Sequence, residues 1–172
     1  AAFQSARGAN ALSVAEQRAL ATAKQLLGRA YSNLTAYRQA LALHREVLEI
    51  FSALRDTANI ARGEQYLAET YWLNAEFQSA LQHQQRALQW IAPLPDKPLH
   101  IRAQTSFGLI KLSLGDLEAA LDAQKRALQI ALEWEEERET EAQREQATVQ
   151  KNLGVTYLQL KQQAQALASF QA

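Results

Sequence analysis

Residues 67–81 read LAETYWLNAEFQSAL, and this stretch decides the fold because its key positions return at nearly fixed intervals. The same Ala-Leu pair occurs at intervals of 40, 40 and 46 residues, as Ala40-Leu41, Ala80-Leu81, Ala120-Leu121 and Ala166-Leu167. A small residue stands twelve positions before each pair, and these residues are Gly28, Ala68, Gly108 and Gly154. A period of this length predicts stacked structural repeats.

The segments around these marks have the periodicity of amphipathic helices. Apolar residues recur every three to seven positions, which is typical of helices that pack on one side. Two capping boxes, Ser13–Glu16 and Thr140–Gln143, and the turn pair Gly115-Asp116 mark helix ends. The equivalent turns lack Gly and lie near Thr35, Ala75 and Lys161. We expect no strands, the end of a preceding helix at residues 1–7, and helices near residues 14–33, 37–53, 57–73, 77–92, 98–113, 117–137, 141–159 and 163–172.

The composition is that of an ordinary folded protein with no net charge. Of 172 residues, 48% are apolar, and 18 Lys and Arg balance 18 Asp and Glu. This balance argues against a nucleic-acid partner and against a polybasic membrane anchor, and no apolar run approaches the ~20 residues of a membrane span. With no Cys, there are no disulfides. We expect a cytoplasmic protein, and the missing Met and the end within a helix suggest a fragment of a larger protein.

The recurring register resembles the tetratricopeptide repeat family, and in particular its longer-helix branch, which includes kinesin light chains and many bacterial multi-repeat proteins. The family's first helix carries a large apolar residue, a small residue and an aromatic residue, here Leu27-Gly28 with Tyr31, Leu67-Ala68 with Tyr71, Phe107-Gly108 with Lys111, and Leu153-Gly154 with Tyr157. The family's early Trp is missing in every repeat, and Lys111 breaks the aromatic column. The resemblance implies an all-α, right-handed α-solenoid of antiparallel helix pairs.

The period divides this single solenoid, residues 1–172, into repeats. Residues 1–20 should hold the end of a preceding helix and a lead-in, followed by repeats at 21–60, 61–100 and 101–146 and a truncated fourth at 147–172. The third repeat carries six extra residues within Glu133–Glu145, a stretch without Gly or Pro. We expect these residues to lengthen two helices. The sequence leaves open whether the acidic stretch is a docking spur or a solvated extension.

Two helices approach closely only where the side chains between them are small. The pattern predicts that each small residue of a first helix faces the recurring Ala of the second helix, as Gly28 would face Ala40, and a larger residue at such a contact would overpack it. The leucines that stand eight residues after the recurring Ala should be buried, at a cost of about 2–5 kcal/mol each on truncation to Ala. These leucines are Leu48, Leu88 and Leu128.

The residues do not form a catalytic or metal-binding set. His44, His83 and His100 are the only histidines, and none pairs with another ligand at i, i+4 spacing in the manner of a metal site. Neither a nucleophile elbow nor a phosphate-binding loop occurs in the sequence. We therefore expect no enzyme activity, no metal and no cofactor.

The resemblance implies that the first helix of each pair lines a concave groove. Carried over to this chain, the groove positions are Gln25, Arg29, Asn33, Arg62, Gln65, Tyr66, Glu69, Trp72, Arg102, Thr105, Leu109, Lys151 and Asn152. Aromatic and Arg side chains anchor many interfaces. We expect a protein-interaction scaffold that binds a peptide or helical segment of a partner in this groove. For Trp72, packing against the next repeat's helix is an equal alternative.

The sequence argues against one role of the family and leaves another open. Co-chaperone members hold a C-terminal carboxylate with five positions that correspond here to Gln25, Arg29, Tyr66, Arg102 and Ser106, and only Arg102 keeps the expected charge. The alternative function is a structural spacer or self-association module. Uncapped repeats expose an apolar face that another copy can cover end to end.

Overall fold

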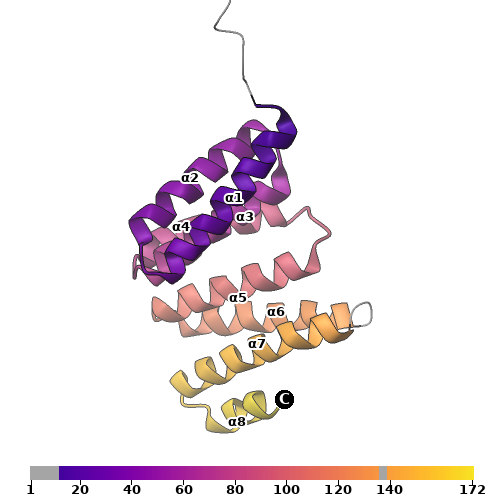
Figure 1. Ribbon diagram of the computed structural model, residues 1–172. Helices are drawn as coiled ribbons and strands as arrows, with labels where there is room; N and C mark the ends of the chain where they lie inside the picture. The colour runs from indigo at the N-terminus through magenta and orange to yellow at the C-terminus, as the bar shows by residue number, and fades with distance from the viewer. Residues whose placement is uncertain (1–11, 136–138) are drawn as a thin grey trace, which may run out of the picture.

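The computed structural model describes residues 12–135 and 139–172, and all regular structure in these ranges is helical. Its helices are α1 (Val14–Asn33), α2 (Tyr37–Ala53), α3 (Thr57–Leu73), α4 (Phe77–Ile91), α5 (Lys97–Ser113), α6 (Leu117–Glu135), α7 (Glu139–Gln159) and α8 (Gln163–Gln171). Each helix packs against the next, and helix pairs stack in chain order from α1 to α8 (Figure 1). The described residues therefore form the predicted all-α solenoid, in which α1, α3, α5 and α7 are the first helices of the pairs.

The predicted helix bounds agree with the structure to within two residues wherever they fall on described residues. Ser13 caps α1 as predicted: its backbone N–H donates to Glu16 Oε2 at 2.8 Å, and its Oγ accepts from Glu16 N at 3.3 Å. The capping box at Thr140 is wrong, because Thr140 already lies within α7. The helix end predicted at residues 1–7 falls outside the described residues.

The turns inside the helix pairs share one geometry, with a single residue in the left-handed region. Gly115 has φ 79° there, and the equivalent residues Thr35, Ala75 and Lys161 have φ 59°, 59° and 61°. The next backbone N–H returns to the carbonyl five residues earlier, as Glu76 N does to Tyr71 O at 2.8 Å. This bond is the one that closes a Schellman motif. The three turns without Gly thus adopt the conformation that Gly favours.

The small residues of the first helices do permit close packing, but at the three Gly positions the nearest side chain belongs to another residue than the predicted Ala. A Cβ at Gly28 would lie 2.5 Å from His44 Cε1, and one at Gly108 would lie 2.9 Å from Gln124 Cγ. A Cβ at Gly154 would overlap the ring of Phe170. The nearest side chain thus stands sixteen positions later, and at Gly108 the predicted Ala120 is in contact as well, with its carbonyl oxygen 3.2 Å from such a Cβ. The recurring Ala residues are buried beside these contacts.

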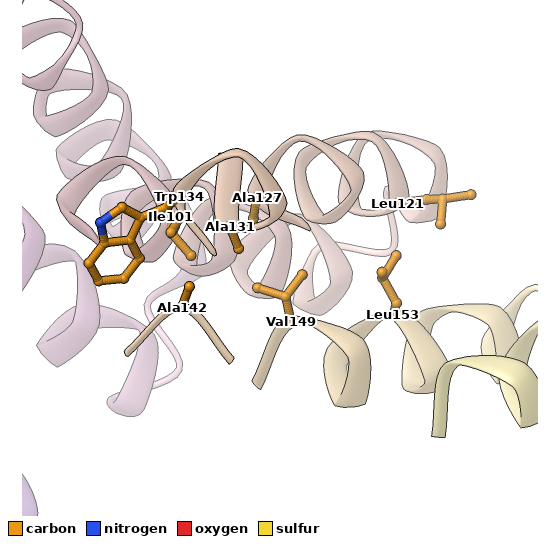
Figure 2. Close-up of a cluster of buried hydrophobic side chains, with 8 residues drawn as sticks. All are labelled: Ile101, Leu121, Ala127, Ala131, Trp134, Ala142, Val149 and Leu153. Carbon is orange, nitrogen blue, oxygen red and sulfur yellow. The ribbon is translucent and has the colours of Figure 1, made fainter. Parts of the chain in front are cut away.

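The core is a series of apolar clusters between successive helices. Figure 2 shows the cluster between α5, α6 and α7, formed by Ile101, Leu121, Ala127, Ala131, Trp134, Ala142, Val149 and Leu153. The expectation of full burial for Leu48, Leu88 and Leu128 is wrong. These leucines pack against the clusters with part of each side chain in solvent, while the preceding residues Val47, Ala87 and Ala127 are fully buried.

Candidate functional site

A groove with a volume of about 440 Å³ lies on the first helices. Nine of its lining residues are among the predicted positions, namely Arg29, Arg62, Gln65, Tyr66, Glu69, Trp72, Arg102, Thr105 and Leu109. The remaining lining residues are Ser106, Ile110, Glu145 and Thr148. The groove is thus lined by α1, α3, α5 and α7. Each of these helices contacts the next one in this series directly.

Helical periodicity explains why these residues share a surface. On α3, the lining residues Arg62, Tyr66, Glu69 and Trp72 follow at steps of four, three and three, which places them on one face. The same steps on α5 place Arg102, Ser106 and Leu109 beside them. Since α3 and α5 lie side by side, the two faces form one continuous wall.

Trp72 joins two first helices and also lines the groove. Its indole Nε1 on α3 donates to Ser113 Oγ on α5 at 2.8 Å. The side chain is half-buried, and one part of it faces the groove together with Leu109 and Ile110. The packing alternative for Trp72 is therefore realised, and the same side chain also lines the groove. The hydrogen bond fixes the ring in place, so the groove has a preformed apolar floor.

Tyr66 is supported from behind by a buried histidine. The ring of His44 on α2 stacks on Tyr66 with centroids 5.5 Å apart and an interplanar angle of 18°. The Arg29 guanidinium lies 5.5 Å from the Tyr66 centroid. His44 is 1% exposed, and neither ring nitrogen has a hydrogen-bond partner among the described residues. Burial, and after it the positive charge of Arg29, lowers the pKa of His44 from 6.5 to about 4, so the ring is neutral at pH 7.

The groove carries charges of both signs. Arg62 Nη2 donates to Asp96 Oδ2 at 3.2 Å, which neutralises that guanidinium. Among the described residues, Arg102 donates only a long bond of 3.4 Å from Nε to the Pro98 carbonyl, and the residue is exposed. Glu69 and Glu145 supply carboxylates to the same lining. Such a surface can form ion pairs and hydrogen bonds with a polypeptide beside its apolar floor.

Four predicted site residues lie outside the groove lining. Gln25 is buried, because it shares the face of α1 that carries Gly28 and packs against α2. Asn33 and Lys151 are exposed and Asn152 is half-buried, but none of the three lines the groove.

Sequence reasoning did not assign Ile110 and Glu145 to the site. Ile110 belongs to a core cluster with residues of α2, α3 and α4, and it also lines the groove. Glu145 lies three residues before Thr148 on α7, so the two share a helix face. This three-residue spacing is the sequence feature that could have identified Glu145 as a groove residue.

Two absences hold for the described part of the chain. No three His, Asp or Glu side chains there are grouped as a metal ion would require. Among the helices described, none is long and apolar enough to span a bilayer.

Residues 56–133 match the tetratricopeptide repeat family. No curated protein matches the chain. Among solved structures, the chain is similar to BtubC from P. vanneervenii, with 19% identity and a TM-score of 0.76 over 90% of this chain and 62% of that chain. A kinesin light chain of Podosopora anserina with nearly identical TPR-like repeats has 17% identity and a TM-score of 0.72, over 93% and 74% of the two chains.

A third similar structure contains a bound peptide. It is the Rap conjugation gene regulator of the plasmid pLS20 in complex with the Phr peptide, with 15% identity and a TM-score of 0.74. The similarity covers 99% of this chain and 47% of that chain. The chain thus spans less than two thirds of BtubC and about half of the Rap regulator. At these identities the similarity shows the fold.

Proposed function

Residues 56–133 match the tetratricopeptide repeat family, and on that premise we propose that the chain is a protein-interaction scaffold whose groove binds an extended or helical segment of another protein. The observation that carries the proposal is the groove itself. About 440 Å³ of space lies over a row of four first helices, with aromatic, apolar and charged side chains side by side. We expect the protein to act by binding its partner without a chemical reaction, because the lining offers apolar and charged contacts.

The apolar floor is where most of the affinity should arise. Well-packed aromatic and apolar anchors dominate the binding energy of many interfaces, and Trp72 and Leu109 are side chains of this kind in the groove lining. The hydrogen bond from Trp72 to Ser113 holds the indole in position before the partner arrives, which lowers the entropic cost of binding.

The charged side chains of the groove should contribute more to the choice of partner than to the affinity. Exposed ion pairs contribute about 1 kcal/mol or less. Arg62 is already paired with Asp96, so Arg102, Glu69 and Glu145 are better placed to meet charges on a partner. The Phr peptide in the similar Rap regulator supports a peptide as the kind of ligand to test.

A peptide selection with matched variants tests this function. Peptides would be selected from a random library on the immobilised protein, and their affinities measured by calorimetry. We expect Leu109→Glu, in the groove, to weaken the selected peptides at least tenfold. Leu132→Glu is the control, because Leu132 is an exposed leucine on α6 outside the lining. Equal affinities for the parent and both variants, with folding verified by circular dichroism, would remove the groove from the proposal.

A further inference from the structure

Four charged residues of the groove lining form no ion pair among the described residues. They lie on four successive first helices, and their signs alternate in chain order as Arg29 on α1, Glu69 on α3, Arg102 on α5 and Glu145 on α7. The fifth charged residue of the lining, Arg62, is neutralised by Asp96. Since each first helix contacts the next, the four charges follow one another along the groove. We call these four residues the charge row.

The charge row is open to a ligand. Arg29, Glu69 and Arg102 are exposed, and Glu145 is half-buried. The Arg29 guanidinium lies 5.5 Å from the Tyr66 ring centroid, and Arg102 donates to a backbone carbonyl, so neither cation is neutralised. An oppositely charged group of a partner can therefore meet each member of the row.

The repeat register gives the spacing of the charge row. Arg29 and Glu69 are 40 residues apart, so they lie at the same height on adjacent helices, whose axes are about 10 Å apart in typical packing. Arg102 stands seven residues before the height of Glu69 once the interval of 40 is applied, and this offset along the axis increases the step to about 14 Å. Glu145 stands three residues before the height of Arg102 once the interval of 46 is applied, which gives a step of about 11 Å.

We propose that the groove recognises a segment of a partner protein in which acidic and basic side chains alternate at these distances, a ligand chemistry that rests on the proposed function of the groove. Acidic side chains would face Arg29 and Arg102. Basic side chains would face Glu69 and Glu145. In an extended segment, which advances about 3.3 Å per residue, successive charges would stand about three or four residues apart. In a helical segment, which advances about 1.5 Å per residue, the interval would be about seven to nine residues.

Alternating signs make the charge row selective. A uniformly acidic or basic chain would be repelled by half of the row, and like charges that face each other across an interface exclude wrong partners. A matched segment displaced by one step would bring each of its charges next to one of the same sign, so the row also fixes the register of the ligand. The row thus specifies the order of charges in the partner as well as their number.

Charge reversal on both molecules tests this order. The probes are peptides selected from a random library on the immobilised protein, and only those that Leu109→Glu weakens at least tenfold are kept, because they bind in the groove. Each member of the row is reversed singly, and each charged residue of a peptide is reversed in turn. The protein variants are Arg29→Glu, Glu69→Arg, Arg102→Glu and Glu145→Arg. Affinities are measured by calorimetry, and circular dichroism verifies that the variants fold.

We expect alternating charges in the selected peptides and one restoring position for each protein variant. Each reversal in the protein should weaken a parent peptide at least fivefold, since an attraction becomes a repulsion. Reversal of a single charge in the peptide should restore the affinity to within twofold. Read in one direction along the peptide, the four restoring positions should follow the order α1, α3, α5 and α7. Arg86→Glu is the control and should change the affinity less than twofold, because Arg86 is exposed on α4 outside the lining.

Three results would overturn the proposal in different ways. Restoration by a reversed charge at any position in the peptide would show nonspecific attraction in place of a matched row. Groove-dependent peptides without alternating charges, or insensitive to all four reversals, would exclude the charge row and leave the groove as the binding surface. Failure of every selected peptide to respond to Leu109→Glu would exclude the groove itself, and the charge row with it.

Discussion

One buried position distinguishes the first helix pair from the second and third. His44, Gln84 and Gln124 occupy the same place in the register, and all three are buried. Gln84 donates to Ala103 O, and Gln124 accepts from Thr156 Oγ1 at 2.8 Å, so each amide reaches the next first helix. His44 instead stacks on Tyr66, which lines the groove.

This difference shows how one position can serve two purposes in a repeat protein. The two Gln side chains join consecutive repeats by buried hydrogen bonds, which specify the stacking. The neutral ring of His44 supports a groove residue from behind and is matched by Gly28, which has no side chain to displace it. In the second pair, Ala68 stands in the position of Gly28, and the partner there is the more flexible Gln84.

Lowering the pH should produce the largest effect that separates His44 from the two Gln residues at the equivalent positions. The pKa of His44 is lowered to about 4, while unfolded His titrates near 6.5, so protons bind the unfolded chain better. The contribution of neutral His44 is complete above pH 6.5 and is lost as the pH falls toward 4, by about 3 kcal/mol in total. Urea unfolding of the parent and of His44→Gln at pH 7, 5.5 and 4.5 measures this. Parallel losses in both proteins would refute it.

Gly28→Ala should cost about 2 kcal/mol, because the new methyl group would overlap the buried ring of His44. Combining it with His44→Gln recreates the Ala68 and Gln84 pair of the second repeat, and most of the loss should be recovered. A double-mutant cycle of unfolding free energies gives the coupling. Simple additivity of the two changes would show that Gly28 and His44 are independent.

Thr156→Val should cost about 1–2 kcal/mol. The substitution leaves Gln124 Oε1 buried without its donor. Thr148→Val is the control, because Thr148 is exposed and bonds only to the Arg144 carbonyl in its own helix. Thermal unfolding of both variants should separate them, and equal stabilities would contradict an inter-repeat role for Gln124.

Ala75→Gly should stabilise the protein by up to about 1 kcal/mol. Ala75 has φ 59°, a conformation that costs a residue with a Cβ roughly 1–2 kcal/mol, although Gly also gains entropy in the unfolded chain. Gly115→Ala in the equivalent turn should destabilise by a similar amount. No atom lies within 4 Å of a Cβ there, so the effect would be backbone strain alone. Opposite signs for the two variants in urea unfolding are the expected outcome.

Local signals made most of the fold predictable. The capping box at Ser13, the turn at Gly115 and the apolar periodicity locate helices because each acts over only a few residues. The family resemblance also implied that the first helices form the groove, and nine of the positions carried over from it do line the groove.

The misplaced residues depend on how neighbouring helices rotate against each other. Gln25 and Arg29 are four residues apart, yet Gln25 is buried and Arg29 is exposed in the groove. Helical periodicity alone does not locate the boundary between the buried side and the groove side of α1 to within one residue. The support of Tyr66 by His44 joins α2 to α3 through stacked rings, and no sequence spacing encodes that contact.

The most direct test of the groove as the binding surface uses the three tryptophans as reporters in one spectrum. Trp72 lines the groove, Trp90 is 42% exposed on α4 outside the lining, and Trp134 is buried in the core. Their indole N–H signals would be followed by nuclear magnetic resonance while a selected peptide is added. The groove account predicts that the Trp72 signal shifts with saturation while the other two stay in place. A shift of Trp90 with Trp72 unchanged would place the partner on the other side of the solenoid and contradict the account.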